Sequence, residues 1–168
     1  MSRVRNGGID IFQCFLIFII SLIFFLCFMS SLFACNKVIK VSDGDTFHIE
    51  VNGETNKYRV LGIDTFDRKA ERVEKQIKRT GFTTLEVVLK SQEAKNFAKE
   101  LLLDKCVDIK NDKGAGKDPY GRKLAYIYIN GEDYSKIILE KELAMVYCEN
   151  KKIAKFQEYQ QISKWKCK

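Results

Sequence analysis

The stretch at residues 38–53 reads Val-Ile-Lys-Val-Ser-Asp-Gly-Asp-Thr-Phe-His-Ile-Glu-Val-Asn-Gly, and it decides the fold. Apolar and polar side chains alternate on both sides of Asp43-Gly44-Asp45-Thr46, and a period of two predicts half-buried β-strands. Asn52-Gly53 is typical of two-residue hairpin turns, because both positions accept a positive φ. A third strand is expected at about 55–63, so these segments predict a β-meander.

The rest of the chain combines expected helices and strands. Thr83-Thr84-Leu85-Glu86 fits the capping-box pattern at the start of a helix. Helices are expected at about 84–103, 134–142 and 153–165, and strands at about 106–109 and 124–129. Five strands with interposed helices predict a mainly β fold with α: a five-stranded OB-fold barrel capped by about three helices.

Length and charge limit the class of protein. A chain of 168 residues corresponds to about one domain, which excludes a large multidomain machine. The sequence has 29 Lys and Arg against 22 Asp and Glu, a formal net charge of +7. A basic surface favours acidic partners such as nucleic acid.

The first 35 residues differ from the rest. Arg3 and Arg5 precede an apolar run at 11–34 that carries no charge. Such a segment predicts an export signal or a membrane anchor. Residues 32–35, Leu-Phe-Ala-Cys, resemble a bacterial lipobox, in which Cys35 is lipidated. An uncleaved membrane helix and a freely secreted product are the alternatives. All three place the domain at 36–168 outside the cytoplasm.

The cysteines do not form an obvious framework. Two of the six lie in the apolar segment and Cys35 is the lipidation candidate, which leaves Cys106, Cys148 and Cys167. An odd number cannot close a disulfide framework. One bridge is conceivable, but Cys106 and Cys148 are expected as buried thiols that pack as small apolar side chains.

Three short segments carry the groups for phosphate chemistry: Asp43 to Thr46, Tyr58 to Asp67, and Asp118 to Tyr126. Each alone has an ordinary explanation as a turn, a strand or a loop. Together they bring carboxylates and arginines to adjacent strand ends. Hard divalent cations bind carboxylate oxygens, and a bound cation polarises a phosphate and acidifies water. A guanidinium pairs with two phosphate oxygens at once. The combination predicts phosphodiester cleavage.

The order of these motifs resembles the staphylococcal nuclease family, also called thermonucleases. The matching segments are Asp-Gly-Asp-Thr at 43–46, Arg-Val-Leu-Gly-Ile-Asp-Thr at 59–65, Glu93-Ala94, Asp-x-Tyr-Gly-Arg-x-Leu-Ala-Tyr at 118–126, Leu-Ala-x-Val at 143–146 and Trp165. The resemblance covers about residues 37–165. It implies a Ca²⁺-dependent endonuclease that hydrolyses DNA and RNA to 3′-phosphate products. We expect a monomer that prefers single strands and is tethered to a membrane.

The resemblance also implies site residues. The implied metal ligands are Asp45, Asp64 and the backbone carbonyl of Thr65. The implied catalytic groups are Arg59 and Arg122, which hold the scissile phosphate, and Asp67 at the position of the general base. The implied substrate contacts are Tyr120, at the terminal phosphate, and Tyr147, which stacks on a base.

Departures from the family pattern affect the expected activity. Thr65-Phe66-Asp67 stands where the family has Thr-Pro-Glu, so the base is one methylene shorter and its loop lacks the proline. Misplacement by about 1 Å can cost on the order of a hundredfold in rate. Pro119 replaces a frequent Lys, and Glu142 replaces a Gly.

The stretch at 68–92 is longer than the family has and is rich in Lys and Arg. It is either a solvated charged helix or an electrostatic guide for a phosphate backbone. His48, the only histidine, is expected to point away from the core and to take no part in catalysis.

Two other functions remain open at this stage. One is a non-catalytic nucleic-acid-binding module that keeps the barrel and the charge. The other is a cell-surface adhesion or structural domain that uses the fold without nucleic acid.

Overall fold

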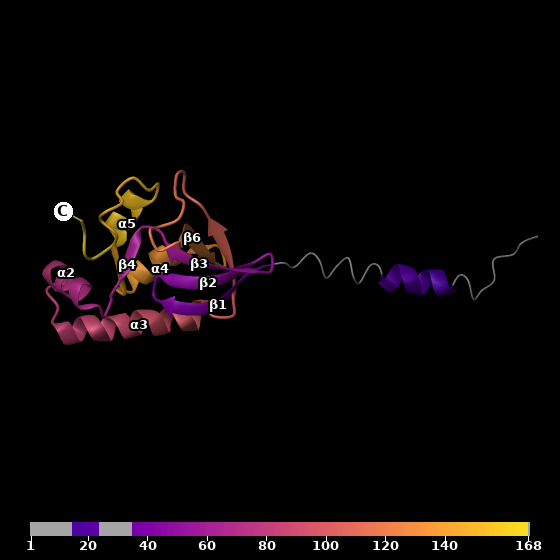
Figure 1. The fold of residues 1–168 in the computed structure, drawn as a ribbon, viewed down its shortest axis with the longest axis horizontal. Coiled ribbons are helices and arrows are strands. Elements are labelled where there is room, and N and C mark those ends of the chain that lie inside the picture. Colours follow the sequence, from indigo (N-terminus) through magenta and orange to yellow (C-terminus); the bar gives the residue numbers. More distant parts are fainter. Residues whose placement is uncertain (1–14, 24–34, 168) are drawn as a thin grey trace, which may run out of the picture. The chain divides into compact units, whose positions relative to one another are not determined.

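The computed structural model describes residues 15–23 and 35–167, and the chain divides into two units, Met1–Ala34 and Cys35–Lys168 (Figure 1). In the first unit, residues 15–23 are helical and their side chains are exposed. None of the described helices combines the length and the apolar character that crossing a membrane requires. Residues 32–34 of the lipobox-like segment lie outside the described residues.

The second unit is built on a closed five-stranded barrel. Its strands are β1 (Asn36–Asp43), β2 (Thr46–Val51), β3 (Glu54–Val60), β5 (Cys106–Lys110) and β6 (Lys123–Ile129). They follow the order β3-β2-β1-β5-β6, and a parallel pairing of β3 with β6 closes the sheet. The short β7 (Glu132–Asp133) pairs antiparallel with the last residues of β6. The predicted mixed fold with an OB-type barrel is confirmed.

The meander at the start of the barrel follows the predicted alternation. Phe47 and Ile49 are buried, whereas His48 between them is half-buried and lies within hydrogen-bonding distance of Ser42. Asn52 and Gly53 have φ values of 51° and 80°, as a hairpin turn of this type requires. The predictions for these strands, for the turn and for the orientation of His48 are confirmed.

The third strand is shorter than predicted. β3 ends at Val60, the chain turns at 61–62, and β4 (Ile63–Thr65) pairs instead with β8 (Ala144–Val146). Gly62 explains the break: its φ is 81°, and a Cβ there would lie 2.7 Å from the ring of Tyr159. Only glycine permits this close approach. The turn moves Asp64 and Thr65 out of the barrel sheet and into a separate ribbon.

Four helices accompany the barrel within the described part of the second unit. They are α2 (Ala70–Thr80), α3 (Thr84–Leu102), α4 (Tyr134–Glu140) and α5 (Phe156–Ile162). The predicted capping box of α3 is present: Thr83 and Glu86 exchange hydrogen bonds. α5 is shorter than the predicted 153–165. Figure 1 shows α3 running along the side of the barrel that carries β1, with α2 beside its first turns.

Glu142 follows α4 in a left-handed backbone conformation, with φ 53°. The Leu143 N–H donates to the Ile138 carbonyl across this turn, at 3.1 Å. The helix end therefore has the geometry that favours glycine, although glycine is absent.

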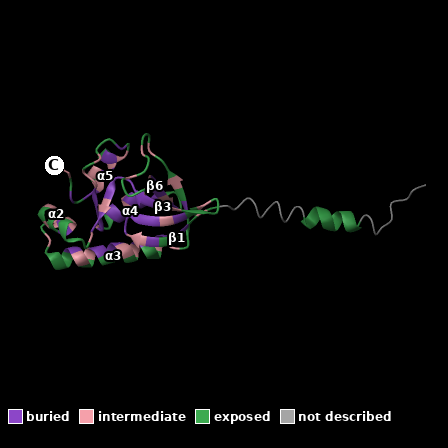
Figure 2. Ribbon diagram, in the orientation of Figure 1, coloured by how far each residue is buried: buried purple, intermediate pink, exposed green. Residues whose placement is uncertain are grey.

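Two hydrophobic clusters stabilise the second unit. The larger one fills the barrel and includes Phe47, Ile127 and Tyr134. The smaller one is formed by Phe66, Val73, Val87, Met145 and Trp165, and we call it the lateral cluster. Figure 2 shows that the buried residues concentrate in the barrel, while α2 consists largely of exposed and half-buried residues. The lateral cluster joins α2, the first turns of α3, β8 and the C-terminal segment.

The prediction for the cysteines was wrong. Cys106 is exposed and Cys148 is half-buried, and both form disulfides rather than packing as free thiols. The bridges are Cys35–Cys106 and Cys148–Cys167. Cys35 is the fourth cysteine of this unit and pairs with Cys106, so the number of cysteines available for bridges is even. The first bridge joins the start of β1 to β5, whose residues at this point are already paired in the sheet.

Candidate functional site

Asp45 lies in the tight turn between β1 and β2 and is 5% exposed. Its Oδ2 accepts hydrogen bonds from the Thr65 N–H at 2.9 Å and from Thr65 Oγ1 at 2.8 Å. The Thr46 hydroxyl donates to Oδ1 at 3.0 Å. The buried Tyr134 hydroxyl donates to the Gly44 carbonyl at 2.5 Å and so braces the turn from the barrel core. Asp45 is therefore held on both sides of its carboxylate.

Gly44 brings the turn close to β4. A Cβ at this position would lie 2.9 Å from Thr65 Cγ2 and 3.0 Å from Ala94 on α3. A larger side chain would force the turn away from Thr65. The Asp-Gly-Asp order is thus a packing requirement as well as a source of carboxylates.

Arg59 connects the two predicted metal carboxylates. It lies on β3, opposite Thr46 in the register, and is 7% exposed. Its Nη1 is ion-paired with Asp45 Oδ2, and its Nη2 donates to Asp64 Oδ1 at 2.9 Å. Asp64 belongs to β4, so this one guanidinium joins the barrel to the β4–β8 ribbon.

Asp67 follows β4 and carries the carboxylate at the position of the presumed base. Its Oδ1 accepts from the Lys69 N–H at 3.0 Å. Arg72 of α2 places Nη1 3.5 Å from Asp67 Oδ2 and 3.2 Å from Asp64 Oδ1. The structure therefore brings Asp45, Arg59, Asp64 and Asp67 together, as the sequence predicts, and adds Arg72 to them.

Phe66 occupies the place of the family proline and is fully buried in the lateral cluster. Its ring centroid lies 5.5 Å from that of Trp165 and 5.8 Å from that of Phe82. Gln76 contacts the residue on each side: Nε2 donates to the Thr65 carbonyl at 3.2 Å, and Oε1 accepts from the Asp67 N–H at 3.1 Å. The loop is held by side chains in the absence of the proline.

Arg122 reaches the cluster through Thr46. Its Nη1 donates to Thr46 Oγ1 at 3.2 Å, and its Nε donates to Asp118 Oδ2 at 2.6 Å. Asp118 also accepts from the backbone N–H groups of Tyr120 and Arg122. Tyr120 is 84% exposed, and Arg122 lies over its ring, 5.4 Å from the centroid. Both predicted side chains face the same cavity.

This cavity has a volume of about 300 Å³ and a strongly polar lining. The lining residues are Ser42, Asp43, Asp45, Thr46, Lys57, Asp67, Lys69, Arg72, Tyr120 and Arg122. Carboxylates occupy its floor, and four cationic side chains surround them. Such an arrangement suits a metal ion together with a phosphate group. A larger cavity of about 500 Å³, beside Tyr58 and Lys117, has no carboxylate among its lining residues.

Tyr147 is separated from this cavity. It lines a smaller one of about 180 Å³ together with Asp64, Lys75, Gln76 and Arg79, and its hydroxyl donates to Glu149 at 2.7 Å. The predicted stacking residue therefore neighbours Asp64 but does not face Arg122 or Tyr120.

Direct ion pairs do not engage every carboxylate of the site. Four of them, Asp43, Asp45, Asp64 and Asp67, lie together, and two guanidinium groups, Arg59 and Arg72, pair with them. Burial, assisted by the charge of Asp45, raises the pKa of Asp43 to about 6. Burial also raises the pKa of Asp64, despite Arg59. For Asp45, burial is outweighed by Arg59 and by the hydrogen bonds of Thr65, so its pKa is lowered. Carboxylates gathered this closely are the oxygen ligands that hard divalent cations bind.

The donor atoms fit a hard cation, although the site is not a closed ligand set. Within the described residues, no three His, Cys, Asp or Glu side chains are grouped so as to hold a metal ion by themselves. The oxygen Asp64 Oδ2 receives no hydrogen bond from any described residue, and Asp45 Oδ1 receives only that of Thr46. Two carboxylate oxygens, completed by water, suit Ca²⁺.

Several contributors were missed by sequence reasoning. Arg72, Gln76, Asp118 and Tyr134 position or neutralise the predicted residues, and Asp43 adds a carboxylate to the cavity. Asp43 and Asp118 belong to the quoted motifs, and Arg72 belongs to the basic stretch at 68–92 that was weighed as a guide for a phosphate backbone. Gln76 and Tyr134 act from helices, where a helical pattern does not distinguish a core residue from a supporting one.

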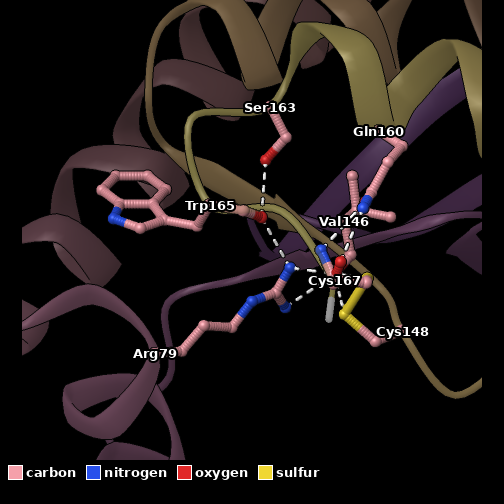
Figure 3. Close-up of a disulfide and its surroundings, with 7 residues drawn as sticks. All are labelled: Arg79, Val146, Cys148, Gln160, Ser163, Trp165 and Cys167. Atoms are coloured by element: carbon pink, nitrogen blue, oxygen red, sulfur yellow. Dashed lines mark hydrogen bonds between the residues drawn. A yellow bond between two sulfur atoms is a disulfide. The ribbon is translucent and has the colours of Figure 1, made fainter.

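The long stretch at 68–92 is neither wholly solvated nor wholly a guide for substrate. Val73 and Gln76 of α2 are buried, and Arg72 binds the site. Arg79 donates to the carbonyls of Val146 and Trp165, both at 2.7 Å. Figure 3 shows its guanidinium pointing at the C-terminal segment beside the Cys148–Cys167 bridge. The outer face of α2 keeps exposed charges such as the Lys78–Glu74 pair.

Comparisons with known proteins bear on the family of the chain. The chain is 40% identical over 123 residues to the uncharacterized protein MJ1439 of Methanocaldococcus jannaschii, covering 68% of this chain and 59% of that protein. It is 32% identical over 108 residues to a thermonuclease of Staphylococcus hyicus, covering 64% and 56%. It is 31% identical over 104 residues to the endonuclease YncB of Bacillus subtilis, covering 62% and 44%. The chain thus spans about half the length of these relatives.

A family model gives stronger evidence for the family of the chain. The model described as staphylococcal nuclease homologue matches residues 57–168, more than half of the sequence. The matched part includes Arg59, Asp64, Asp67 and Arg122. Together with the barrel, this match shows that the chain belongs to the staphylococcal nuclease family.

Proposed function

We propose that this protein is a metal-dependent endonuclease that hydrolyses the phosphodiester bonds of DNA and RNA and leaves 3′-phosphates. The observation that carries the proposal is the joined cluster of Asp45, Arg59, Asp64 and Asp67 beside a cavity lined by Arg122 and Tyr120. Relatives named thermonuclease and endonuclease support the reaction class.

The residues divide the chemistry between them. Asp67 accepts the proton of the attacking water, and Arg72 orients its carboxylate through their ion pair. Arg122 binds the phosphate, because its Nη2 donates to none of the described residues while Nε and Nη1 are held by Asp118 and Thr46. Arg59 balances the charge of Asp45 and Asp64 and contributes the second guanidinium. Fixed donors of this kind stabilise the charge that develops on the phosphate.

Ca²⁺ is the cofactor that we propose. Asp45, Asp64 and the carbonyl of Thr65 would hold it, and a bound divalent cation polarises the phosphate and lowers the pKa of water. Oxygen ligands completed by water are typical of Ca²⁺ sites.

The open, basic cavity favours a single strand. Lys57 and Lys69 line it beside the two arginines, and its volume of about 300 Å³ accommodates a phosphate with its neighbouring sugars more readily than a duplex. We propose that the protein acts as a monomer on single-stranded DNA and RNA. Tyr120 would contact the terminal phosphate, and Tyr147 would stack on a base beyond Asp64.

The test is cleavage of a labelled single-stranded oligonucleotide, with Ca²⁺ and with a chelator. Wild-type protein should cleave only with Ca²⁺, and Asp45→Asn should lose cleavage by at least a hundredfold. Asp108→Asn, an identical change at an exposed position of β5, should leave the rate unchanged. A well-folded protein that shows no metal-dependent cleavage would contradict the proposal.

The second candidate is a non-catalytic nucleic-acid-binding module. The short Asp67 side chain, already paired with Arg72, is the observation in its favour. Salt-dependent binding that ignores both Ca²⁺ and Asp45→Asn would support this candidate. If Asp67→Glu then creates cleavage, the site is a weakened nuclease instead.

We also propose that the protein works outside the cytoplasm and is tethered through its N-terminal segment. Two disulfides support an oxidising compartment. A sulfur atom cannot carry a lipid and a disulfide at once, so lipidation of Cys35 would leave Cys106 unpaired. Mass spectrometry of the membrane-extracted protein decides between the two: a Cys35–Cys106 peptide supports a retained helix, and a lipidated Cys35 supports the lipoprotein.

A further inference from the structure

We propose that Gln76 is a positioning residue that aims the Asp67 carboxylate and the Thr65 carbonyl into the site. This inference deepens the proposed nuclease function and rests on it. Gln76 lies on α2 and is 3% exposed. Its amide spans the loop that carries both groups, so that both ends of the loop depend on one side chain.

The contacts of Gln76 use both halves of its amide. Nε2 donates to the Thr65 carbonyl at 3.2 Å, and Oε1 accepts from the Asp67 N–H at 3.1 Å. A buried amide that satisfies a backbone acceptor and a backbone donor two residues apart fixes the peptide planes between them. Leu or Met at this position could do neither.

The loop has few other supports. Thr65 is paired with Ala144 in the β4–β8 ribbon, but the ribbon ends there. Beyond it, among the described residues, Asp67 is held only by Gln76, by the Lys69 N–H and by Arg72, and Arg72 is half-exposed. Strand pairing therefore ends at Thr65, two residues before the Asp67 carboxylate. Gln76 supplies the missing bond at that point.

The position of Gln76 is itself rigid. Val73 and Ile77, three residues before it and one after it, pack in the lateral cluster, and the Phe66 ring is buried in the same cluster. The helix and the loop are thus joined by apolar packing in the lateral cluster and by the two hydrogen bonds of Gln76. A shift of α2 would move Asp67 with it.

The bond to Thr65 also bears on metal binding. A carbonyl oxygen has two lone pairs, and Gln76 engages one of them, which leaves the other for a cation. The Thr65 N–H is meanwhile bound to Asp45, so both backbone groups of this residue are fixed by side chains. We expect loss of Gln76 to weaken Ca²⁺ binding as well as turnover.

A matched control is present in the same molecule. Gln160 on α5 makes the same pair of bonds to Cys167: Nε2 donates to its carbonyl at 2.9 Å and Oε1 accepts from its N–H at 3.0 Å. Gln160 lines neither cavity that contains the site residues. Gln76→Met and Gln160→Met remove the same chemistry with little change in volume.

The experiment uses the full chain in detergent and measures three quantities: backbone amide exchange by NMR, Ca²⁺ affinity by calorimetry, and kcat and KM on an oligonucleotide. Gln76→Met should raise the exchange rate of the Asp67 amide at least tenfold, weaken Ca²⁺ binding about threefold, and lower kcat at least tenfold with KM within about twofold. Gln160→Met should change none of these.

A second variant guards against misfolding. Gln76→Glu keeps an acceptor for the Asp67 N–H, so it should retain protection of that amide while losing the bond to the Thr65 carbonyl. Unchanged amide exchange and unchanged kcat in Gln76→Met would overturn the inference. If wild-type protein shows no cleavage, the proposed nuclease fails, but the Asp67 amide still decides whether Gln76 holds the loop.

Discussion

The two halves of the site are stabilised in different ways. Thr46 and Arg59 face each other in the barrel register, and the turn carrying Asp45 joins two paired strands. Asp67 follows a three-residue strand and depends on α2 and the lateral cluster for its orientation. Strand pairing places Asp45, the proposed metal ligand, and side-chain packing places Asp67, the proposed base. Substitutions should therefore separate the two halves.

The largest expected effect on the free energy of unfolding comes from removing an aromatic ring, either from the lateral cluster or from the barrel core. Phe66→Ala and Phe47→Ala each delete a fully buried ring and should cost about 3–5 kcal/mol. Trp165, the only tryptophan, lies against Phe66 and reports on the lateral cluster by fluorescence, while circular dichroism reports mainly on the barrel and helices. In Phe66→Ala, the fluorescence transition in urea should precede the circular dichroism transition.

Phe47→Ala is the control for this comparison, because its ring packs on Tyr134 inside the barrel. Both probes should report a single transition for that variant. Coincident transitions in Phe66→Ala would mean that the lateral cluster and the barrel unfold as one unit, and the distinction between the two halves would then be wrong.

Removing the two disulfides should also affect the lateral cluster and the barrel differently, with smaller changes in the free energy of unfolding. The Cys148–Cys167 bridge closes a separation of 19 residues, and replacing both cysteines with serine should cost about 3 kcal/mol by loop entropy. The loss of stability should appear mainly in the fluorescence transition of Trp165, because this residue lies inside that loop. Replacing Cys35 and Cys106 should instead shift both probes together, since that bridge joins two barrel strands.

The smallest effect concerns the charge of Arg72. Its Nη1 lies 3.2 Å from Asp64 Oδ1, so this cation competes with a metal for the same carboxylate. Arg72→Gln should strengthen Ca²⁺ binding about three- to tenfold by calorimetry, and should lower cleavage because Asp67 loses a partner. Lys78→Gln removes the same charge from the outer face of α2, where Lys78 pairs with Glu74. Equal changes in both variants would show a general charge effect only.

Local patterns predicted most of the barrel half. The alternation at 38–53, the Asn52-Gly53 turn and the capping box at Thr83 are all present, because each depends on neighbours in the chain. The same patterns brought Asp45 and Arg59 together through strand pairing. The β4–β8 ribbon was missed, since its shortness follows from the close approach of Gly62 to Tyr159, which lies far away in the sequence.

The helix at 70–80 shows what local patterns could not predict. Its density of Lys, Arg and Glu predicted a solvated segment, and its outer face agrees with that. Its inner face depends on Phe66, Met145 and Trp165, which come from three other parts of the chain. No pattern within the helix indicates that Gln76 meets a loop or that Arg79 caps the C-terminal segment.

The main barrel strands, the hairpin turn, the charge and the identity of the carboxylates and arginines could all be predicted from the sequence, because they follow from local periodicity and motifs. The cysteine pairing, the burial of Phe66 and the β4–β8 ribbon could be seen only in the folded structure. Those features depend on contacts between distant segments, where packing and the need to satisfy buried polar groups select one arrangement among many.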